Sequence, residues 1–199
     1  MTTASRLLVA QITDTHLFAE VDRTWKGLST ARTLQSVLQH LQQIQPQPDL
    51  LLLTGDLSQD ETPESYELLA SLISPLKIPA YWIPGNHDNL SVMQQILDKP
   101  PISPEKSFQL GNWQFLLLSS VEAGCNGGKL SPETLDWLDS QLQQTGDRPV
   151  MIALHHHPLP IDCEIMDGMM LHNSDEFFVI VDRYPQVKIV ICGHIHQEF

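Results

Sequence analysis

Residues 50–56 of the chain read Leu-Leu-Leu-Leu-Thr-Gly-Asp. Four consecutive leucines show no helical spacing, and a short unbroken apolar run is typical of a strand that is buried on both faces. Gly55 suits a tight turn that lets the backbone pass close to a bound group, and Asp56 follows it directly. The segment therefore predicts a buried strand over residues 49–54 that brings a carboxylate to the edge of a sheet.

Apolar runs of the same kind recur on both sides of this segment. We expect strands at residues 7–13, 80–83, 150–154 and 187–192, and a hairpin formed by residues 108–110 and 113–119. Helical spacing or an N-terminal Thr-Pro or Ser-Pro signal places helices at residues 34–44, from Thr62, from Ser131 and near residues 174–183. Strands that alternate with helices indicate an α/β fold.

Five of the expected strands end in polar residues. These residues are Asp14 and His16; Asp56; Asn86, His87 and Asp88; His155, His156 and His157; and His194 and His196. Ligands of α/β sheets bind beyond the carboxyl ends of the strands, so we expect all five groups at one sheet edge. In extended chain, the two pairs with a spacing of two residues would present both side chains on one face and reach one ion.

The side-chain types indicate the metal chemistry. Carboxylate, amide oxygen and imidazole without thiolate suit Mn, Fe, Co or Zn. One ion would need only three or four protein ligands. Seven candidates therefore favour two ions that share a bridging carboxylate, and two ions about 3.5–4 Å apart can bind phosphate oxygens and lower the pKa of a bridging water.

In this order, the motifs Asp-x-His, Gly-Asp, Gly-Asn-His-Asp, His and Gly-His-x-His resemble those of the calcineurin-like metallophosphoesterases. The resemblance extends from Asp14 to His196. Within that superfamily the chain is similar to the bacterial class III cyclic-AMP phosphodiesterases over residues 11–17, 54–60, 84–88, 155–160 and 192–198. The resemblance implies a four-layer α/β/β/α sandwich made by a single phosphoesterase domain, residues 1–199.

The resemblance also implies a role for each polar residue. The ligands of the first ion would be Asp14, His16 and His196. Those of the second ion would be Asn86, His155 and His194, with Asp56 bridging the two ions. His87 would lie beside the substrate phosphate as general acid or charge stabiliser, and Asp88 would orient it. For His156 and His157, a supporting or substrate-side role and simple loop packing both remain open.

The activity that the resemblance implies is hydrolysis of 3′,5′-cyclic AMP to 5′-AMP by a hydroxide that two divalent metal ions activate. Iron and/or manganese are the expected ions, with zinc or cobalt as alternatives. The same core can serve glycerophosphodiesters, 2′,3′-cyclic nucleotides or phosphomonoesters, so a broad-specificity phosphodiesterase is an alternative. A non-catalytic metal-binding protein is a second alternative.

The composition limits the expected partners. The chain has 24 acidic residues and 11 Lys and Arg. The resulting net charge of −13 disfavours binding to nucleic acid or to membrane surfaces. Bound cations would still allow an anionic small-molecule nucleotide substrate. With three scattered cysteines, no signal-peptide pattern and no apolar run near the roughly 20 residues of a membrane span, we expect a cytoplasmic protein without disulfides.

The end of the sequence departs from the family pattern. The chain stops at Phe199, three residues after His196. The resemblance implies further strands beyond this point that complete a second sheet and often take part in dimerisation. We therefore expect a domain that lacks the C-terminal strands of the family, while a homodimer stays open.

Overall fold

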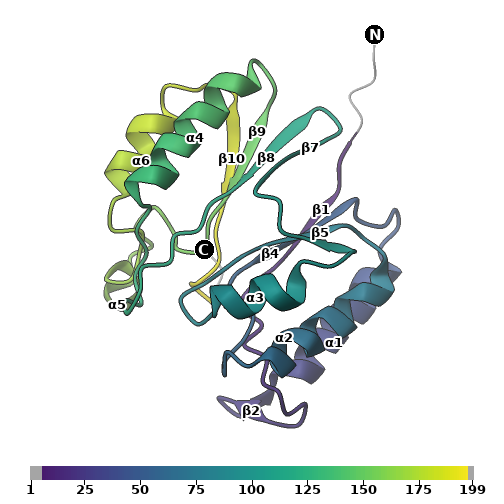
Figure 1. The fold of residues 1–199 in the computed structure, drawn as a ribbon. Coiled ribbons are helices and arrows are strands. Elements are labelled where there is room, and N and C mark those ends of the chain that lie inside the picture. The colour runs from purple at the N-terminus through teal and green to yellow at the C-terminus, as the bar shows by residue number, and fades with distance from the viewer. Residues whose placement is uncertain (1–5, 197–199) are drawn as a thin grey trace. The chain divides into compact units, whose positions relative to one another are not determined.

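The computed structural model describes residues 6–196, which form two compact units (Figure 1). The N-terminal unit is Leu7–Pro104, and the C-terminal unit is Glu105–Phe199 together with Met1–Arg6. Residues 1–5, where a signal peptide would begin, and residues 197–199, which include the end of the 192–198 segment, lie outside the described residues.

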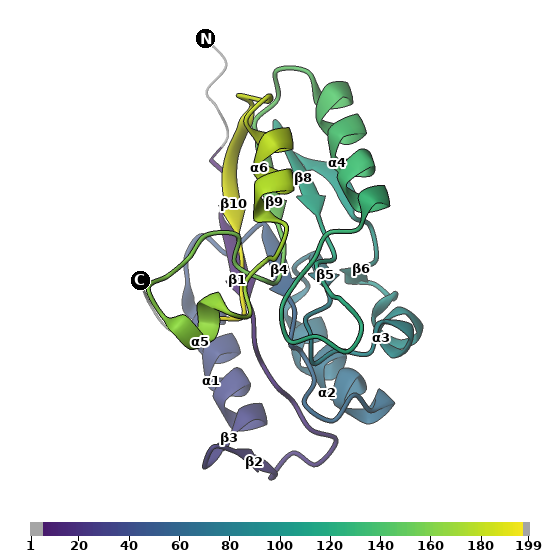
Figure 2. The same ribbon diagram turned by 90° about the vertical axis from the view of Figure 1, so that its left-hand side faces the viewer.

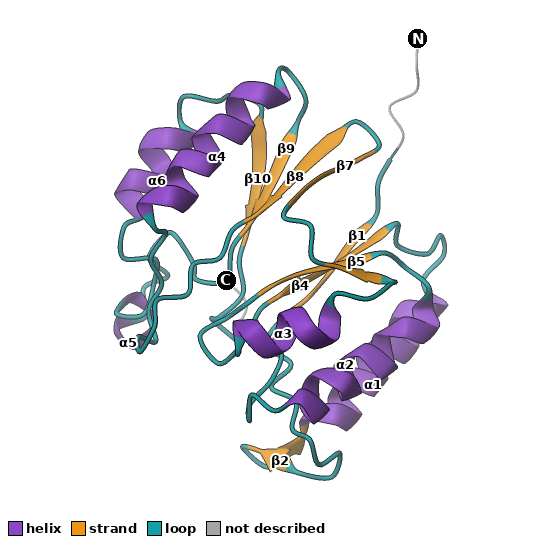
Figure 3. Ribbon diagram, viewed as in Figure 1, coloured by secondary structure: helices purple, strands orange, loops and turns teal. Residues whose placement is uncertain are grey.

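The N-terminal unit is a parallel sheet with helices over one face (Figure 3). In spatial order its strands are β1 (Val9–Ile12), β4 (Leu50–Thr54), β5 (Ala80–Ile83) and β6 (Ile102–Ser103). Its helices are α1 (Thr30–Gln43), α2 (Pro63–Ile73) and α3 (Leu90–Leu97), with a short 3₁₀ turn, η1 (Ser74–Leu76). Every residue of the inner strand β4 is buried, which explains its unbroken run of leucines.

The C-terminal unit has a mixed sheet in the spatial order β10, β9, β8, β7. The antiparallel hairpin of β7 (Ser107–Leu110) and β8 (Trp113–Leu117) is extended in parallel by β9 (Val150–Ala153) and β10 (Val187–Ile191). Its helices are α4 (Pro132–Thr145), α5 (Glu164–Asp167) and α6 (Ser174–Val181). Helices α4 and α6 lie side by side on one face of the sheet (Figure 2).

The elements agree with most of the sequence predictions. Thr62 and Ser131 cap α2 and α4, each directly before a proline, as expected. Several elements were not expected: helix α3, which Asn89 caps, a small hairpin of β2 (Thr24–Trp25) and β3 (Leu28–Ser29), and the short elements β6, η1 and α5. None of the helices in the described residues has the length and apolarity that a membrane span requires.

The expectation that all five polar segments border one sheet is wrong. Three of them follow β1, β4 and β5 of the first sheet, and two follow β9 and β10 of the second. Strands β9 and β10 pair with the β7–β8 hairpin, so they belong to a sheet of their own. Each unit therefore contributes its own cluster of candidate ligands.

Candidate metal centre

The loops that follow β1 and β4 continue to pair after both strands have ended. The backbone N–H of Asp14 donates to the Gly55 carbonyl at 2.9 Å, and that of His16 donates to the Asp56 carbonyl at 2.9 Å. Farther on, Leu17 N–H donates to the Leu57 carbonyl at 3.1 Å. This ladder fixes the Asp-x-His segment beside Asp56.

The backbone at these ligands is left-handed, so the expectation of extended Asp-x-His and His-x-His pairs is wrong. The φ angles are 54° at Asp14, 42° at His16, 50° at Asp56, 74° at His194 and 47° at His196. Nine non-glycine residues of the described chain have positive φ, and these five candidates are among them. Side chains with a Cβ seldom adopt this region, and such strain concentrates at functional sites.

The result in the N-terminal unit is a tight group of donor atoms. The ligand atoms of Asp14, His16 and Asp56 lie within 4.8 Å of one another. His16 Nε2 is 3.8 Å from Asp56 Oδ2, and these two side chains are only 2% and 3% exposed. Two carboxylates and an imidazole held this closely, with His16 and Asp56 buried and Asp14 partly buried, form a donor set that suits a divalent cation.

The turn after β5 places Asn86 and His87 beside this group. The backbone N–H of His87 donates to Asp56 Oδ1 at 2.8 Å. Asn86 Oδ1 is shielded from solvent and has no hydrogen-bond partner in the described part of the chain. A buried amide oxygen without a partner costs free energy, and coordination to a cation would remove that cost.

Asp88 fixes this turn through backbone contacts, and its effect on the orientation of the His87 ring stays a prediction. Its carboxylate accepts hydrogen bonds from the backbone N–H groups of Leu57 (3.0 Å), Ser58 (3.1 Å) and Gly85 (2.9 Å) and from the Tyr66 hydroxyl (3.1 Å). Burial raises the pKa of Asp88 to about 6, and the Asp56 charge adds to the rise. Asp88 thus ties the loop after β4 to the turn after β5.

Gln59 is the residue that lies against the His87 ring. Its Nε2 is 3.5 Å from His87 Nδ1, a long contact, and its Oε1 is shielded from solvent with no hydrogen bond to any described residue. The His87 ring also meets the His16 ring edge-on, with 5.3 Å between centroids. No sequence pattern points to Gln59, because a glutamine two residues after the Gly-Asp-Leu turn carries no metal-ligand signal.

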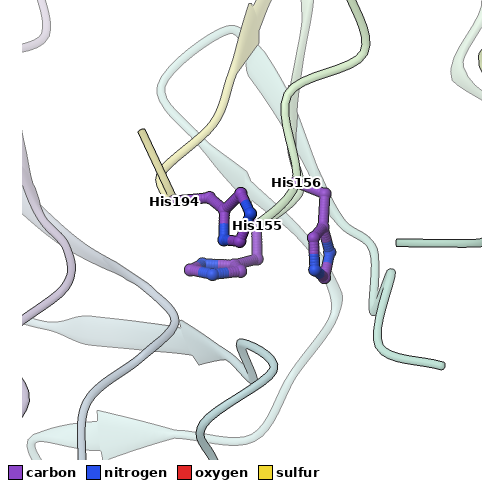
Figure 4. A group of neighbouring side chains, drawn as sticks. All are labelled: His155, His156 and His194. Carbon is purple, nitrogen blue, oxygen red and sulfur yellow. The ribbon is translucent and has the colours of Figure 1, made fainter. Parts of the chain in front are cut away.

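In the C-terminal unit the rings of His155, His156 and His194 meet (Figure 4), and their donor atoms lie within 4.8 Å of one another. The His155 and His194 rings are 5.1 Å apart and nearly perpendicular, at 74°. Gly193 N–H donates to the His155 carbonyl at 2.9 Å, which holds the end of β10 beside the end of β9. The structure thus brings two of the predicted ligands of the second ion together.

His156 has hydrogen bonds on both ring nitrogens. Nε2 lies 3.2 Å from the Asn126 carbonyl, which only accepts, so Nε2 carries the hydrogen. Nδ1 therefore accepts from the Ser120 hydroxyl at 2.8 Å, while the Ser120 oxygen lies 3.3 Å from the His156 backbone N–H. This bonding favours the supporting role for His156 over metal coordination.

The remaining histidines are placed differently. His157 is buried, with Nε2 3.8 Å from Asp167 Oδ1, and burial lowers its pKa although Asp167 acts in the opposite direction. Its ring stacks near His194 at a centroid distance of 5.9 Å. His196, two residues beyond His194, is exposed. The structure leaves the role of His157 open.

Comparison with known proteins identifies the family. The sequence model described as calcineurin-like phosphoesterase matches residues 7–198. The chain belongs to the calcineurin-like phosphoesterase family. The α/β class expected from the sequence is thereby confirmed, and so is the predicted resemblance.

Two curated relatives of this phosphoesterase are named for cyclic nucleotides. It is 50% identical to a 3′,5′-cyclic-nucleotide phosphodiesterase of Nostoc sp. over 96% of its own length and 72% of the relative. It is 40% identical to the 3′,5′-cyclic adenosine monophosphate phosphodiesterase CpdA of Escherichia coli K12 over 98% of its length and 71% of that protein.

Solved structures support the fold. A dimetal phosphatase from Danio rerio superposes with a TM-score of 0.71 at 13% identity and covers 96% of this chain and 82% of its own. A purple acid phosphatase from yellow lupin gives a TM-score of 0.68 at 17% identity, over 98% of this chain and 38% of its own. At these identities the likeness concerns the fold alone.

Proposed function

We propose that this phosphoesterase hydrolyses 3′,5′-cyclic AMP to 5′-AMP in a metal-dependent reaction. The observation that carries the proposal is the convergence of Asp14, His16 and Asp56, whose donor atoms lie within 4.8 Å of one another. The relatives named as cyclic-nucleotide phosphodiesterases support the choice of substrate.

The proposed ligands divide between two ions. The first ion would be held by Asp14, His16 and His196. The second would be held by Asn86, His155 and His194, and Asp56 would bridge both. We propose that residues 1–199 act as one phosphoesterase domain, which the family match over residues 7–198 supports. Oxygen and nitrogen donors without thiolate suit Mn, Fe, Co or Zn, and the resemblance to the cyclic-AMP phosphodiesterases makes iron and/or manganese the proposed ions, with zinc or cobalt as alternatives.

The residues of this chain would then act on the phosphate as follows. Bound there, two divalent ions would supply Lewis acidity to the phosphate oxygens and lower the pKa of a water. The water oxygen forms the new bond to phosphorus and loses a proton to solvent, while the bond from phosphorus to the 3′-oxygen breaks. His87, held by its backbone N–H on Asp56, donates a proton to that leaving oxygen. Asp88 keeps the His87 turn in place through its backbone contacts.

The proposal includes the setting of the reaction. The substrate is a small nucleotide in the cytoplasm rather than nucleic acid or a membrane component, and a homodimer is compatible with the activity. The net charge of −13 supports the exclusion of nucleic acid and membrane surfaces, because binding to these polyanions needs basic patches.

The test is an assay with defined metal content. Protein purified without chelator is analysed for metals and then incubated with 3′,5′-cyclic AMP, while 5′-AMP is separated and quantified. Chelation should abolish turnover, and Mn²⁺ or Fe²⁺ should restore it. Full turnover after confirmed removal of metal would overturn the proposal.

Two alternatives have distinct outcomes in the same assay. A broad-specificity phosphodiesterase would turn over 2′,3′-cyclic AMP or a glycerophosphodiester at least as well as 3′,5′-cyclic AMP. A non-catalytic metal-binding protein would contain metal but hydrolyse none of these esters.

A further inference from the structure

The β2–β3 hairpin is too small to be stable without outside contacts. It consists of two strands of two residues, Thr24–Trp25 and Leu28–Ser29, and lies between Leu17 and α1. Lys26 and Gly27 at its turn have φ angles of 49° and 81°, the conformation that closes two-residue hairpins. Isolated hairpins are at best marginally stable in water, so packing must hold this one in place.

That packing includes a ring contact with a candidate metal ligand. The indole of Trp25 stacks on the imidazole of His16 with 4.3 Å between centroids and 26° between planes. Lys26 Nζ lies 4.3 Å from the centroid of the same indole. Leu28, the cross-strand neighbour of Trp25, is 66% exposed and so contributes little packing.

The stack matters because of where His16 stands. Its backbone is left-handed at φ 42°, and its ring must keep one orientation to direct a nitrogen at an ion. Groups that contact a metal-ligating histidine fix its ring and strengthen binding of the ion. The Trp25 indole covers one face of the His16 ring and so restricts its rotation.

We infer that Trp25 is a positioning residue, which holds the His16 ring ready for metal and couples metal binding to the order of the β2–β3 hairpin. The inference rests on the proposed function in one respect, that His16 is a metal ligand. Coupling of this kind is reciprocal: if the stack strengthens metal binding, bound metal stabilises the stacked hairpin by the same factor.

Trypsin cleavage can report whether the β2–β3 hairpin is ordered. Arg23 and Lys26 are exposed and follow the consensus for trypsin cleavage, which requires a locally unfolded segment. Metal should therefore slow cleavage after these two residues in the wild-type protein. Because each variant is compared with and without metal, differences in intrinsic cleavage rate cancel.

The experiment compares Trp25→Ala, Trp25→Phe and the matched control Leu28→Ala, with Mn²⁺ as the probe. Mn²⁺ affinity is measured by equilibrium dialysis, and cleavage after Arg23 and Lys26 is followed by mass spectrometry. Loss of the aromatic stack should lower the affinity for the ion that His16 binds by about 3- to 10-fold in Trp25→Ala. Trp25→Phe should restore affinity, Leu28→Ala should match wild type, and metal protection should be lost only in Trp25→Ala.

Each outcome decides the inference. Equal Mn²⁺ affinity and equal protection in wild type and Trp25→Ala would overturn it, and so would an equal loss in Leu28→Ala. If Trp25→Ala does not fold, Trp25→Leu replaces it, since leucine keeps apolar volume without an aromatic face, and the same losses are expected. Wild-type protein that binds no Mn²⁺, Fe²⁺ or Zn²⁺ would overturn the proposed function, and the role of Trp25 with it.

Discussion

At the scale of single residues, the proposed roles divide the turn after β5 between metal binding by Asn86 and proton transfer by His87. Asn86 and His87 are adjacent, yet Asn86 presents a shielded amide oxygen while the His87 ring lies against Gln59. The backbone of His87, through its bond to Asp56, is fixed independently of the ring. Removing the ring should therefore leave the metal ligands where they are.

We predict that His87→Ala lowers kcat by about 10²- to 10⁴-fold, the usual contribution of a general acid, while metal content stays near that of wild type. Steady-state kinetics with 3′,5′-cyclic AMP and elemental analysis of the same sample measure both quantities. Asp56→Ala is the contrasting variant, in which both ions should be lost. Metal loss in His87→Ala would make His87 a ligand and refute its proposed role.

Ser120 is a second residue with a defined task, because it is the partner of His156 Nδ1. Both side chains are fully buried. We predict that Ser120→Ala lowers the free energy of unfolding by about 1–3 kcal/mol, since a buried acceptor loses its partner. Urea denaturation measures this, and the exposed neighbour provides the control, Ser119→Ala, which should change little. Equal stability of both variants would contradict the assigned hydrogen bond.

At the scale of elements, the loop between β8 and α4 packs on the His156 ring through Gly128. Gly128 forms isolated bridges with Val121 and Leu171. A Cβ built on Gly128 would lie 2.4 Å from His156 Cγ, a distance that requires movement of the ring. The loop thus depends on the absence of a side chain at this position.

We predict that Gly128→Ala destabilises the protein by about 1–3 kcal/mol, the range for overpacked sites, and lowers metal affinity because the His156 ring presses on His155 and His194. Gly168→Ala is the control, since its Cβ would meet atoms no closer than 3.4 Å. Thermal unfolding and Mn²⁺ dialysis measure the two effects. If Gly128→Ala is as stable as Gly168→Ala, the His156 ring moves aside at little cost and the prediction is wrong.

The elements also show what could be predicted from the sequence. Apolar runs and capping pairs predict the strands β1, β4, β5 and β7 to β10 and the starts of α2 and α4, because local chemistry determines both. The β2–β3 hairpin was missed, since two-residue strands leave no periodic pattern and depend on the contact of Trp25 with His16. The candidate ligands were found from their motifs, whereas Ser120 and Gln59 support histidines that are distant in the sequence.

At the scale of the whole molecule, the partition of strands between two sheets could not be derived from the apolar runs. The apolar runs of the strands have the same pattern in both sheets, and contacts between distant residues determine which strands pair. The left-handed backbone of the ligands was equally hidden, because Asp and His carry no signal for positive φ of the kind that glycine gives. The resemblance implied two sheets through its four-layer sandwich, but it assigned neither the strands of each sheet nor the left-handed backbone.

We predict that metal removal lowers the thermal stability of the whole chain. Ions that bind the native state and not the unfolded chain add free energy of unfolding, about 2.7 kcal/mol at a free concentration 100 times the dissociation constant. Thermal melting with chelator and with Mn²⁺ should thus differ by several degrees, and Asp56→Ala should abolish the difference. Identical melting of the wild-type protein under both conditions would count against a bound ion.

The left-handed backbone at Asp14, His16, Asp56, His194 and His196 has an evolutionary consequence. Glycine adopts these angles without the steric cost that Asp and His bear. A lineage no longer under selection for metal binding would relieve this backbone cost by replacing these residues with glycine, but it would lose side-chain contacts such as the His16–Trp25 stack and the hydrogen bond from His87 to Asp56. Glycines at these positions would therefore mark descendants that keep the fold as a scaffold after the chemistry has been abandoned.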